Sequence, residues 1–318
     1  MNSIKLEKFL KQKIKHSKIE IVGKSVLEKP IYAVSFDFKS RYSMIIQAAI
    51  HAREHITCDL VCKMIEEISG NFEKYKKHKI PNIVFVPLSN PDGADIATLG
   101  LKTVKNRNKR KFLLDINNQN KDFSLYKANA NGVDLNTNFD ARWGTGKANL
   151  FYPSSHGFVG ETPNSEPCTQ ALIELTKKIK PFFTISYHCK GEEVYADFFA
   201  KKENLKRDNK IAKIVARTLG YKLVSCQNSS SGGYKDWCIE KLNIPAVTIE
   251  VGSDKLSHPL SENCLEKIWK QNKKLLIKFR KIAKEYEYGR KSKIHEKSTC
   301  SCGKSIWQWR SSGWCGYR

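Results

Sequence analysis

A histidine and a glutamate follow directly after a strongly apolar segment of the chain. Residues 44–50 are almost all apolar, and His51 and Glu54 come next, with two residues between them. Imidazole and carboxylate groups both bind zinc, and a catalytic zinc site takes three protein ligands and leaves a further position open. Because this pair supplies only part of that set, the pattern predicts a zinc site that a residue elsewhere completes.

His188 is the strongest candidate for the third ligand. It lies just after residues 182–186, an apolar segment typical of a buried strand. In an open α/β sheet, functional side chains gather at the carboxyl ends of the strands, so His188 is expected at the same edge as His51. His55 has helical spacing from His51 and is not expected to bind the metal.

The elements that must position these residues alternate between strands and helices. Apolar runs predict strands at residues 19–22, 31–36, 44–50, 83–88, 182–186, 193–199 and 246–251. Helical patterns predict helices at residues 1–18, 56–68, 165–180, 204–219, 232–242 and 260–282. This alternation indicates an α/β sheet with helices on both faces. Residues 95–165 lack periodicity, and we expect a long, loop-rich and functional insertion with short helices there.

The chain of 318 residues is strongly basic, with 56 Lys and Arg against 32 Asp and Glu and a net charge of +24. Such a balance favours anionic partners. Because the lysines are scattered, we interpret most of them as solvated side chains and expect no nucleic acid partner. No apolar run is long enough to cross a membrane, and the N-terminal residues lack the apolar core of a secretory signal. We therefore expect a cytoplasmic location. The chain has ten cysteines, and those in its body show no paired zinc-ribbon spacing and are expected to be free thiols.

The last segment, residues 289–318, differs from the rest of the chain. It holds three of the six tryptophans and three cysteines, and it carries seven Lys or Arg residues from Arg290 onward against one Glu. It shows neither helical nor strand periodicity, so we expect a disordered basic tail. The alternative is a small appendage that binds cell wall, nucleic acid or metal.

Five motifs, in the same order, resemble those of the carboxypeptidase A-like zinc metallopeptidases, the funnelins. They are IHARE at residues 50–54, NPDG at 90–93, GVDLNTNFD at 132–140, SYH at 186–188 and TIEV at 248–251. The resemblance implies a single α/β domain, residues 1–288, with a mixed, mostly parallel and twisted sheet of about eight strands and helices on both faces. It also implies one zinc ion per chain, held by His51, Glu54 and His188.

The resemblance assigns the catalytic roles as well. Glu250 takes the position of the general base, and it lies in an apolar strand where a glutamate without a function would be costly. A structural ion pair is the alternative for this residue. Lys127 stands near the position of the family's electrophilic arginine, with Arg107 and Arg142 as alternatives. A lysine there can still stabilise an oxyanion as a point charge.

A carboxylate is expected behind one of the zinc histidines, and either Asp92 or Asp140 can supply it. Asn136 is expected to orient the substrate. The family's usual arginine after this asparagine, which grips a terminal carboxylate, is replaced by Thr137. Threonine cannot form a bidentate ion pair, so this change points away from ordinary C-terminal substrates.

A second departure concerns the family's flexible-loop tyrosine. Asn228 stands at its expected position, and Tyr234 is nearby in a different phase. HCKGEE at residues 188–193, SGGYKDW at 231–237 and IPAVTIEVG at 244–252 resemble the bacterial γ-D-glutamyl-diamino acid peptidases. That resemblance implies hydrolysis of acidic murein stem peptides, which suits a basic cleft.

Three other functions stay open at this point. They are an ordinary metallocarboxypeptidase, an N-acyl amino acid amidohydrolase on the same fold, and a non-catalytic basic protein that binds anionic polymers. The complete set of expected ligands together with Glu250 argues against the last of these. The sequence specifies neither the diamino acid nor the oligomeric state.

Overall fold

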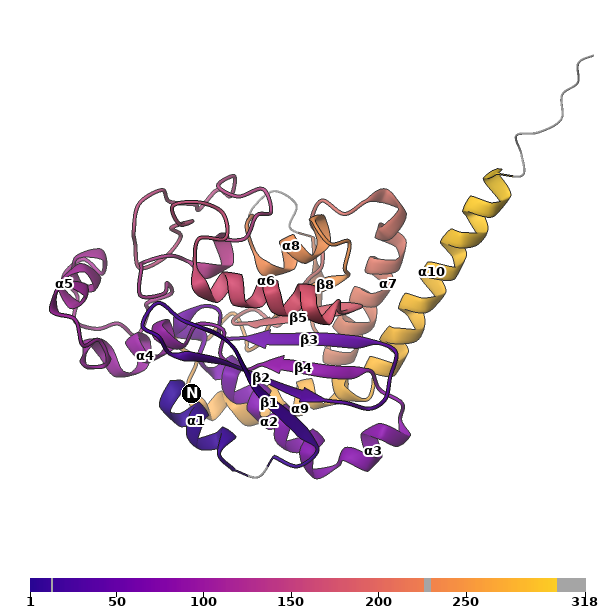
Figure 1. Cartoon of the computed structure of the whole chain (residues 1–318), viewed down its shortest axis with the longest axis horizontal. Coiled ribbons are helices and arrows are strands. Elements are labelled where there is room, and N and C mark those ends of the chain that lie inside the picture. The colour runs from indigo at the N-terminus through magenta and orange to yellow at the C-terminus, as the bar shows by residue number, and fades with distance from the viewer. Residues whose placement is uncertain (13, 226–229, 302–318) are drawn as a thin grey trace, which may run out of the picture.

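An eight-stranded sheet forms the centre of this computed structural model, which describes residues 1–12, 14–225 and 230–301 (Figure 1). The strand order is β1-β2-β4-β3-β5-β8-β6-β7. The strands are β1 Ser17–Lys24, β2 Pro30–Phe36, β3 Ser43–Ala48, β4 Asn82–Val86, β5 Phe183–His188, β6 Glu193–Tyr195, β7 Lys222–Val224 and β8 Ala246–Glu250.

Parallel and antiparallel pairs are mixed in this sheet. β3 pairs in parallel with β4 on one side and β5 on the other, and β5 pairs in parallel with β8. β2 pairs antiparallel with β1 on one side and with β4 on the other, and β6 pairs antiparallel with β8. The chain leaves β3 for β4 on one side and later enters β5 on the other side. The carboxyl ends of β3 and β5 therefore flank a topological switch point, where ligands bind in open α/β sheets.

Helices cover both faces of the sheet, and the prediction of a single α/β domain with a mixed sheet is confirmed. α2, α7 and α9 pack on one face, and α6 and α8 on the other. The helices are α1 Ser3–Leu10, α2 Ile56–Gly70, α3 Phe72–Lys77, α4 Pro91–Leu99, α5 Arg107–Ile116, α6 Pro167–Ile179, α7 Lys202–Leu219, α8 Tyr234–Glu240, α9 Leu265–Leu276 and α10 Phe279–Ser301. Short 3₁₀ turns are η1 Ala52–Glu54, η2 Gly100–Thr103, η3 Leu135–Thr137 and η4 Glu262–Cys264.

The central strands owe their apolar sequence to burial on both faces. Every residue of β5 is buried, and so is all of β3 except Ser43. A parallel strand covered by helices on both sides reads as a continuous apolar run, which is why the sequence locates these two strands well. β1 lies at the edge of the sheet, and each of its residues keeps some exposure.

Element boundaries differ from the sequence-based expectations in several places. The helix expected at residues 1–18 ends at Leu10, because the chain enters edge strand β1 at Ser17. The strand expected at 193–199 stops at Tyr195, where its pairing with β8 ends. The helix expected at 260–282 is divided into η4, α9 and the start of α10.

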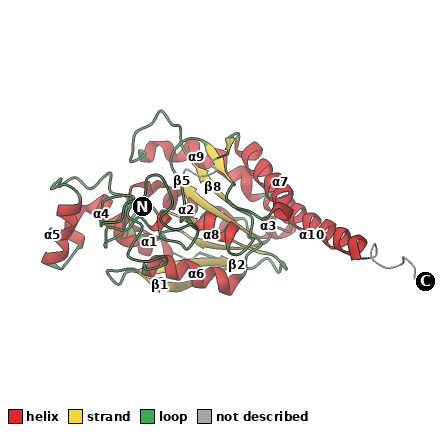
Figure 2. Ribbon diagram, turned by 90° about the horizontal axis from the view of Figure 1, so that it is seen from above, coloured by secondary structure: helices red, strands yellow, loops and turns green. Residues whose placement is uncertain are grey.

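The C-terminal helix α10 continues into the predicted tail. Residues 289–301 were expected to be irregular, but they are helical, and α10 lies at the opposite end of the molecule from α5 (Figure 2). The division of the chain at residue 288 stays a prediction. No helix among the described residues is both long enough and apolar enough to span a membrane.

The predicted insertion, residues 95–165, contains the end of α4, then η2, α5 and η3, with irregular chain between them. A small core of its own supports it, formed by Val104, Leu113, Phe123, Tyr126, Ala128 and Ala130 with Ala52 and Ile96. The carboxyl ends of β3 and β4 point toward α4 and this insertion (Figure 1). The insertion therefore covers the edge of the sheet at which the site is expected.

Candidate metal centre and its two cavities

The turn after β3 brings the first two predicted ligands together. Ala49 has a positive φ of 50°, which directs the chain out of the strand, and Glu54 ends the 3₁₀ turn η1. The hydroxyl of Thr57 accepts from the Ala49 amide and donates to the Glu54 carbonyl. The amide of Ala52 donates to the carbonyl of Lys127 at 3.1 Å. These bonds tie the ligand turn both to α2 and to the insertion.

Asn90, from the NPDG motif, braces the same turn from the other side. Its side-chain amide donates to the carbonyls of Ile50 and Ala128. Its carbonyl oxygen accepts from Gly93 at the start of α4. A Cβ at Gly93 would overlap the Ala128 carbonyl, so only glycine allows α4 to approach this closely.

His188 completes the cluster as the last residue of β5. Its Nδ1 lies 3.1 Å from one oxygen of Glu54 and 3.1 Å from Nδ1 of His51. Nδ1 of His51 in turn lies 2.8 Å from the other Glu54 oxygen. All three side chains are buried, and one ligand atom from each lies within 4.8 Å of the others. The predicted set His51, Glu54 and His188 is therefore brought together in space.

This arrangement fits a divalent metal. Two imidazole nitrogens and a carboxylate facing one point are the ligand types and the number that catalytic zinc sites use. Burial by itself disfavours the charge of Glu54, but the two histidines outweigh it and hold the pKa of Glu54 well below its usual value. The carboxylate is therefore ionised, as a metal ligand must be.

The carboxylate behind the first histidine is Asp134, so the expectation of Asp92 or Asp140 was wrong. Oδ1 of Asp134 lies 3.3 Å from Nε2 of His51, the ring nitrogen that faces away from the cluster. Asp92 instead accepts hydrogen bonds from Ser25 and from the amide of Leu27. Asp140 is half exposed and forms an ion pair with Lys241.

Glu250 stands beside this cluster on the next strand. It is the last residue of β8 and pairs in register with His188 of β5 and Glu193 of β6. Its Oε2 is buried without a hydrogen-bond partner. Burial raises the pKa of Glu250 to about 7, although the charge of His188 acts in the opposite direction. The free oxygen and the raised pKa suit a group that accepts and returns a proton near neutral pH.

Lys127 approaches the same cluster from the insertion. Its Nζ lies 3.0 Å from Oδ2 of Asp134, and its side chain is about one quarter exposed. Of the two alternatives for this cation, Arg142 pairs with Glu240 and stacks on the ring of Phe199. Arg107 is exposed at the start of α5. Lys127 is thus the one of these three cations that reaches Asp134.

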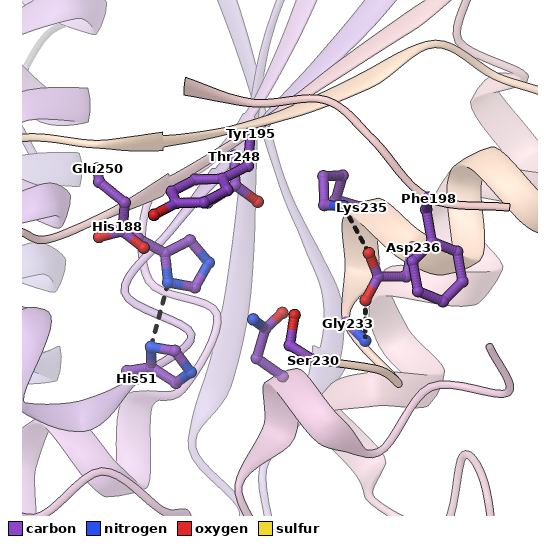
Figure 3. A pocket seen from close by; sticks show the side chains of 11 residues that line it. His51, His188, Tyr195, Phe198, Ser230, Gly233, Lys235, Asp236, Thr248 and Glu250 are labelled. Carbon is purple, nitrogen blue, oxygen red and sulfur yellow. Dashed lines mark hydrogen bonds and ion pairs between the residues drawn. The ribbon is translucent and has the colours of Figure 1, made fainter. Parts of the chain in front are cut away.

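A cavity of about 270 Å³ opens on one side of the cluster, and we name it the strand-side cavity (Figure 3). Beyond the shared residues, its walls come from β5, β6, β8 and α8 and from the segment between β6 and α7. They include His188, Tyr195, Phe198, Lys235, Asp236, Thr248 and Glu250. Nζ of Lys235 lies 2.6 Å from Oδ1 of Asp236 and donates to the carbonyl of Asp197. An ammonium and a carboxylate therefore face the cavity together.

A second cavity, of about 220 Å³, opens on the other side, and we name it the loop-side cavity. Most of its wall comes from the insertion, and it includes Lys127, Asp134, Thr137, Asn149 and His156 together with Arg53 of the ligand turn. His51, Asn136 and Ser230 line both cavities. The ligand His51 therefore lies at the boundary between two differently built cavities, and His188 lines the strand-side cavity alone.

The insertion is tied to the entrance of α8 by backbone bonds at this boundary. The amide of Phe139 donates to the Gly232 carbonyl at 2.9 Å, and the Gly232 amide donates to the Ala141 carbonyl at 2.8 Å. Gly232 has a φ of 77°, and a Cβ there would overlap the carbonyl of Thr137. A second tie joins the amide of Asp134 to the carbonyl of Phe158 at 2.8 Å.

The predicted substrate-binding residues differ in whether they line a cavity beside the metal ligands. Asn136 lines both cavities, and Thr137 lines the loop-side cavity while its hydroxyl donates to the Asp134 carbonyl. Tyr234 does not line either cavity, because its ring is fully buried and its hydroxyl is 2.7 Å from that of Thr176. Asn228 lies outside the described residues.

The side chains at the site that the sequence did not predict include Asp134, Arg53, Asn149, Lys235 and Asp236. Asp134 had a usable signal, since it lies two residues before Asn136 within one motif. Arg53 lies inside the first zinc motif and Lys235 inside the SGGYKDW segment. Asn149 had no signal, because its position depends on the irregular path of the insertion.

A histidine–glutamate–histidine cluster at the switch point of a mixed sheet, beside a glutamate with a buried carboxylate oxygen, defines a zinc peptidase of the carboxypeptidase type. Residues 5–275 match the zinc carboxypeptidase family, and the chain belongs to this family. It is a zinc-metallopeptidase family, as the sequence motifs predict.

Individual relatives give a finer comparison. The chain is 30% identical over 257 residues to γ-D-glutamyl-L-diamino acid endopeptidase 1 of Lysinibacillus sphaericus, covering 76% of this chain and 62% of the relative. It is 27% identical over 249 residues to murein peptide amidase A of Escherichia coli strain K12, covering 75% of this chain and 84% of that protein. The chain thus spans less than two thirds of the length of the first relative.

Solved structures agree on the fold. Bovine thrombin-activatable fibrinolysis inhibitor, in its complex with tick carboxypeptidase inhibitor, superposes with a TM-score of 0.70 at 18% identity, over 92% of this chain and 98% of that one. Murein-tripeptide amidase from Escherichia coli O157 superposes with a TM-score of 0.51 at 24% identity, over 81% and 91% of the two chains.

Proposed function

We propose that this protein hydrolyses the amide bond between a γ-D-glutamyl residue and a diamino acid in murein-type peptides, with one zinc ion per chain. The ligand set and Glu250 support amide hydrolysis, and the two relatives named for such substrates support the substrate class. The main support for a diamino acid as the leaving group is the pair of opposite charges in the strand-side cavity, Lys235 and Asp236.

His51, Glu54 and His188 would hold the zinc ion. When bound, zinc supplies Lewis acidity that polarises a carbonyl group and lowers the pKa of water. Asp134 would keep the ring of His51 in place through its Nε2. Glu250 would accept a proton and pass it to the departing amine, and the charge of Lys127 would stabilise the oxygen on which negative charge develops.

These roles assign the two halves of the substrate to the two cavities. Glu250 lines the strand-side cavity, so the amine that receives its proton, and hence the leaving diamino acid, belongs there. Lys127 lines the loop-side cavity, so the scissile carbonyl and the acyl half belong on that side. The boundary residue Asn136 would then contact the substrate near the scissile bond.

The strand-side cavity suits a leaving group that carries both charges. A diamino acid presents an ammonium and at least one carboxylate, and these are complementary to Asp236 and Lys235. Opposite charges in a partly enclosed site interact more strongly than in water. An apolar C-terminal residue would displace water from the Lys235–Asp236 ion pair without forming a hydrogen bond to either group, which disfavours its binding.

Thr137 supports the same substrate class. Its hydroxyl donates to the Asp134 carbonyl within the chain, and threonine carries no charge with which to grip a terminal carboxylate. An ordinary carboxypeptidase specificity therefore has less support than murein peptide cleavage. The cytoplasmic location expected from the sequence stays a prediction.

The test is a comparison of substrates with the zinc-loaded protein. L-Ala-γ-D-Glu-diamino acid peptide, a standard peptide with a free C-terminus, and an N-acyl amino acid are incubated separately, with Glu250→Gln as the inactive control. Release of the diamino acid only from the first substrate is expected. Cleavage of only the standard peptide would identify an ordinary carboxypeptidase, and cleavage of only the N-acyl amino acid would identify an amidohydrolase.

A further inference from the structure

Two buried hydrogen-bond donors in the loop-side cavity have no partner among the described residues. They are Nε of Arg53 and Nδ2 of Asn149. Both residues line this cavity, and no ion pair joins the guanidinium of Arg53 to any described residue. Buried donors are nearly always hydrogen-bonded in folded proteins, so two such donors in one cavity indicate a ligand with acceptor atoms.

The carboxylate of the cavity is not free to be that acceptor. Asp134 is the only Asp or Glu among the described residues that line it, and both of its oxygens are engaged. Oδ1 faces His51 and accepts from the Asn136 amide, while Oδ2 faces Lys127 and accepts from the Gly157 amide. The cavity therefore offers unused donors and positive charge to a ligand.

We propose that the loop-side cavity binds the free α-carboxylate of a γ-linked glutamyl residue, through Arg53 and Asn149. This inference rests on the proposed function, and it names the chemical group in the acyl half of the substrate that the enzyme recognises. A planar guanidinium and an amide N–H₂ group are suited to the two oxygens of one carboxylate.

The γ-linkage explains why a carboxylate belongs in this place. In a γ-glutamyl peptide the scissile carbonyl is the side-chain carbonyl, and the α-carbon with its free carboxylate lies a short methylene chain beyond it. Lys127, which faces the carbonyl side, lines the same cavity as Arg53 and Asn149. An α-linked peptide has no carboxylate at this distance along its main chain, so the donors would stay unpaired and cost binding free energy.

The test uses two substrates that differ in one group. The first is L-Ala-γ-D-Glu-diamino acid, and the second is the same peptide with the glutamyl α-carboxylate converted to a carboxamide. For the zinc-loaded wild-type protein we expect kcat/KM to be about 10- to 100-fold higher for the carboxylate, the range for a hydrogen bond to a charged group. Arg53→Gln is expected to remove most of that ratio, and Asn149→Ala to reduce it.

Two control variants distinguish recognition of the α-carboxylate from a general loss of activity or folding. Lys235→Gln acts in the other cavity and should lower kcat/KM for both substrates by the same factor, leaving their ratio unchanged. Arg280→Gln makes the same substitution at an exposed position of α10 and should change neither rate. Thermal melting of each variant shows whether it folds. If Arg53→Gln does not fold, Asn149→Ala and the wild-type ratio still decide.

A binding measurement gives a readout that does not depend on turnover. Calorimetric titration of the Glu250→Gln variant with each peptide should show the same preference for the carboxylate, and most of this preference should be lost in the Arg53→Gln, Glu250→Gln double variant.

The outcomes separate the inference from the proposed function. Equal rates and equal binding for the two peptides would overturn the inference and leave the proposed function standing. A preference for the carboxylate that persists in both Arg53→Gln and Asn149→Ala would also overturn the inference, because other residues would then bind the carboxylate. Failure of the wild-type protein to cleave either peptide would overturn the proposed function, and the inference with it.

Discussion

The two cavities beside the metal ligands are built by different kinds of structure. The strand-side cavity takes its reactive carboxylate from β8 and its wall tyrosine from β6, which lie in register in the sheet. The loop-side cavity takes most of its wall from the irregular insertion. Sheet hydrogen bonds fix the strand residues of the first cavity, whereas side-chain bonds such as those of Asn90 and a few backbone hydrogen bonds fix the second cavity.

This difference separates the chemistry from the recognition of the acyl group. A carboxylate at the end of β8 is positioned by the backbone hydrogen bonds to the strands on both sides. It is therefore held where proton transfer requires it. A loop can change length and sequence at little cost to the core. The comparison therefore predicts that loss of Glu250 from the strand-side wall affects the rate most, and that loss of Arg53 or Asn149 from the loop-side wall mainly affects selectivity for the acyl group.

The largest effect is expected at the strand-side wall. Glu250→Gln removes the proton acceptor and keeps its shape, so kcat/KM should fall by about 10²- to 10⁴-fold with little change in metal content. Steady-state kinetics and metal analysis measure the two quantities. Glu193→Gln, its neighbour on β6, is the matched control and should cost far less. Similar losses in both variants would contradict the role of Glu250.

The next effect tests the loop-side wall. Lys127→Met removes the charge near the scissile carbonyl, so kcat should fall by about 10²- to 10³-fold, with a smaller change in KM. Lys109→Met is the control, because Lys109 also lies in the insertion but bonds Asn131 outside the cavity. A rise in KM at constant kcat would show that Lys127 only binds substrate.

Asp134→Asn tests the boundary between the cavities. Loss of the negative charge behind His51 should weaken metal affinity by about 10- to 100-fold. Competition with a chelator measures this directly. The control is Asp92→Asn, whose carboxylate bonds Ser25 and Leu27 and does not contact a metal ligand. Equal metal affinity in wild type and Asp134→Asn would contradict the pairing.

Lys235→Gln should have a smaller effect, confined to the leaving group. It removes one charge that faces the diamino acid, so kcat/KM for that substrate should fall by about 10-fold, the lower range for a charged hydrogen bond. The rate for a leaving group without a side-chain charge should change less. A uniform loss for all leaving groups would assign Lys235 a structural role.

The smallest effect links the two cavities through pH. Glu250 must be ionised to accept a proton, so kcat/KM should fall as pH drops through its pKa. Burial raises that pKa to about 7 in the metal-free protein, and a bound cation lowers it. The charge of Lys127 also lowers it, so Lys127→Met should move the acid limb to higher pH. An unchanged limb in pH–rate profiles would show that the cavities are electrostatically separate.

The position of a site residue can be predicted from the sequence where the residue lies on a regular strand or within a short motif. His188 and Glu250 end buried strands whose apolar runs are visible in the sequence, and neighbouring strand ends meet at one edge. His51 and Glu54 lie within one short motif, so their proximity follows from chain connectivity. The strand and helix order, and hence the fold, follows from the same alternation.

The rest depends on tertiary contacts that a single sequence does not display. Tyr234 is close to the site in sequence, but its position on α8 turns it toward Thr176 and the core, and Lys235, the next residue, faces the cavity. The choice of Asp134 over Asp140 depends on η3, a turn too short to have a periodicity. Asn149 reaches the cavity through irregular chain, for which no pattern exists.

The backbone ties around the insertion have a consequence for protein engineering. Residues 142–157 run between two anchors, the bonds of Phe139 and Ala141 to Gly232 and the bond of Asp134 to Phe158. Asn149 and His156 lie inside this stretch, whereas every proposed metal ligand lies outside it. The stretch therefore suits loop exchange: replacing it with the corresponding stretch of another family member should change the part of the acyl-group selectivity that depends on Asn149, while Arg53 and the metal ligands stay those of the recipient.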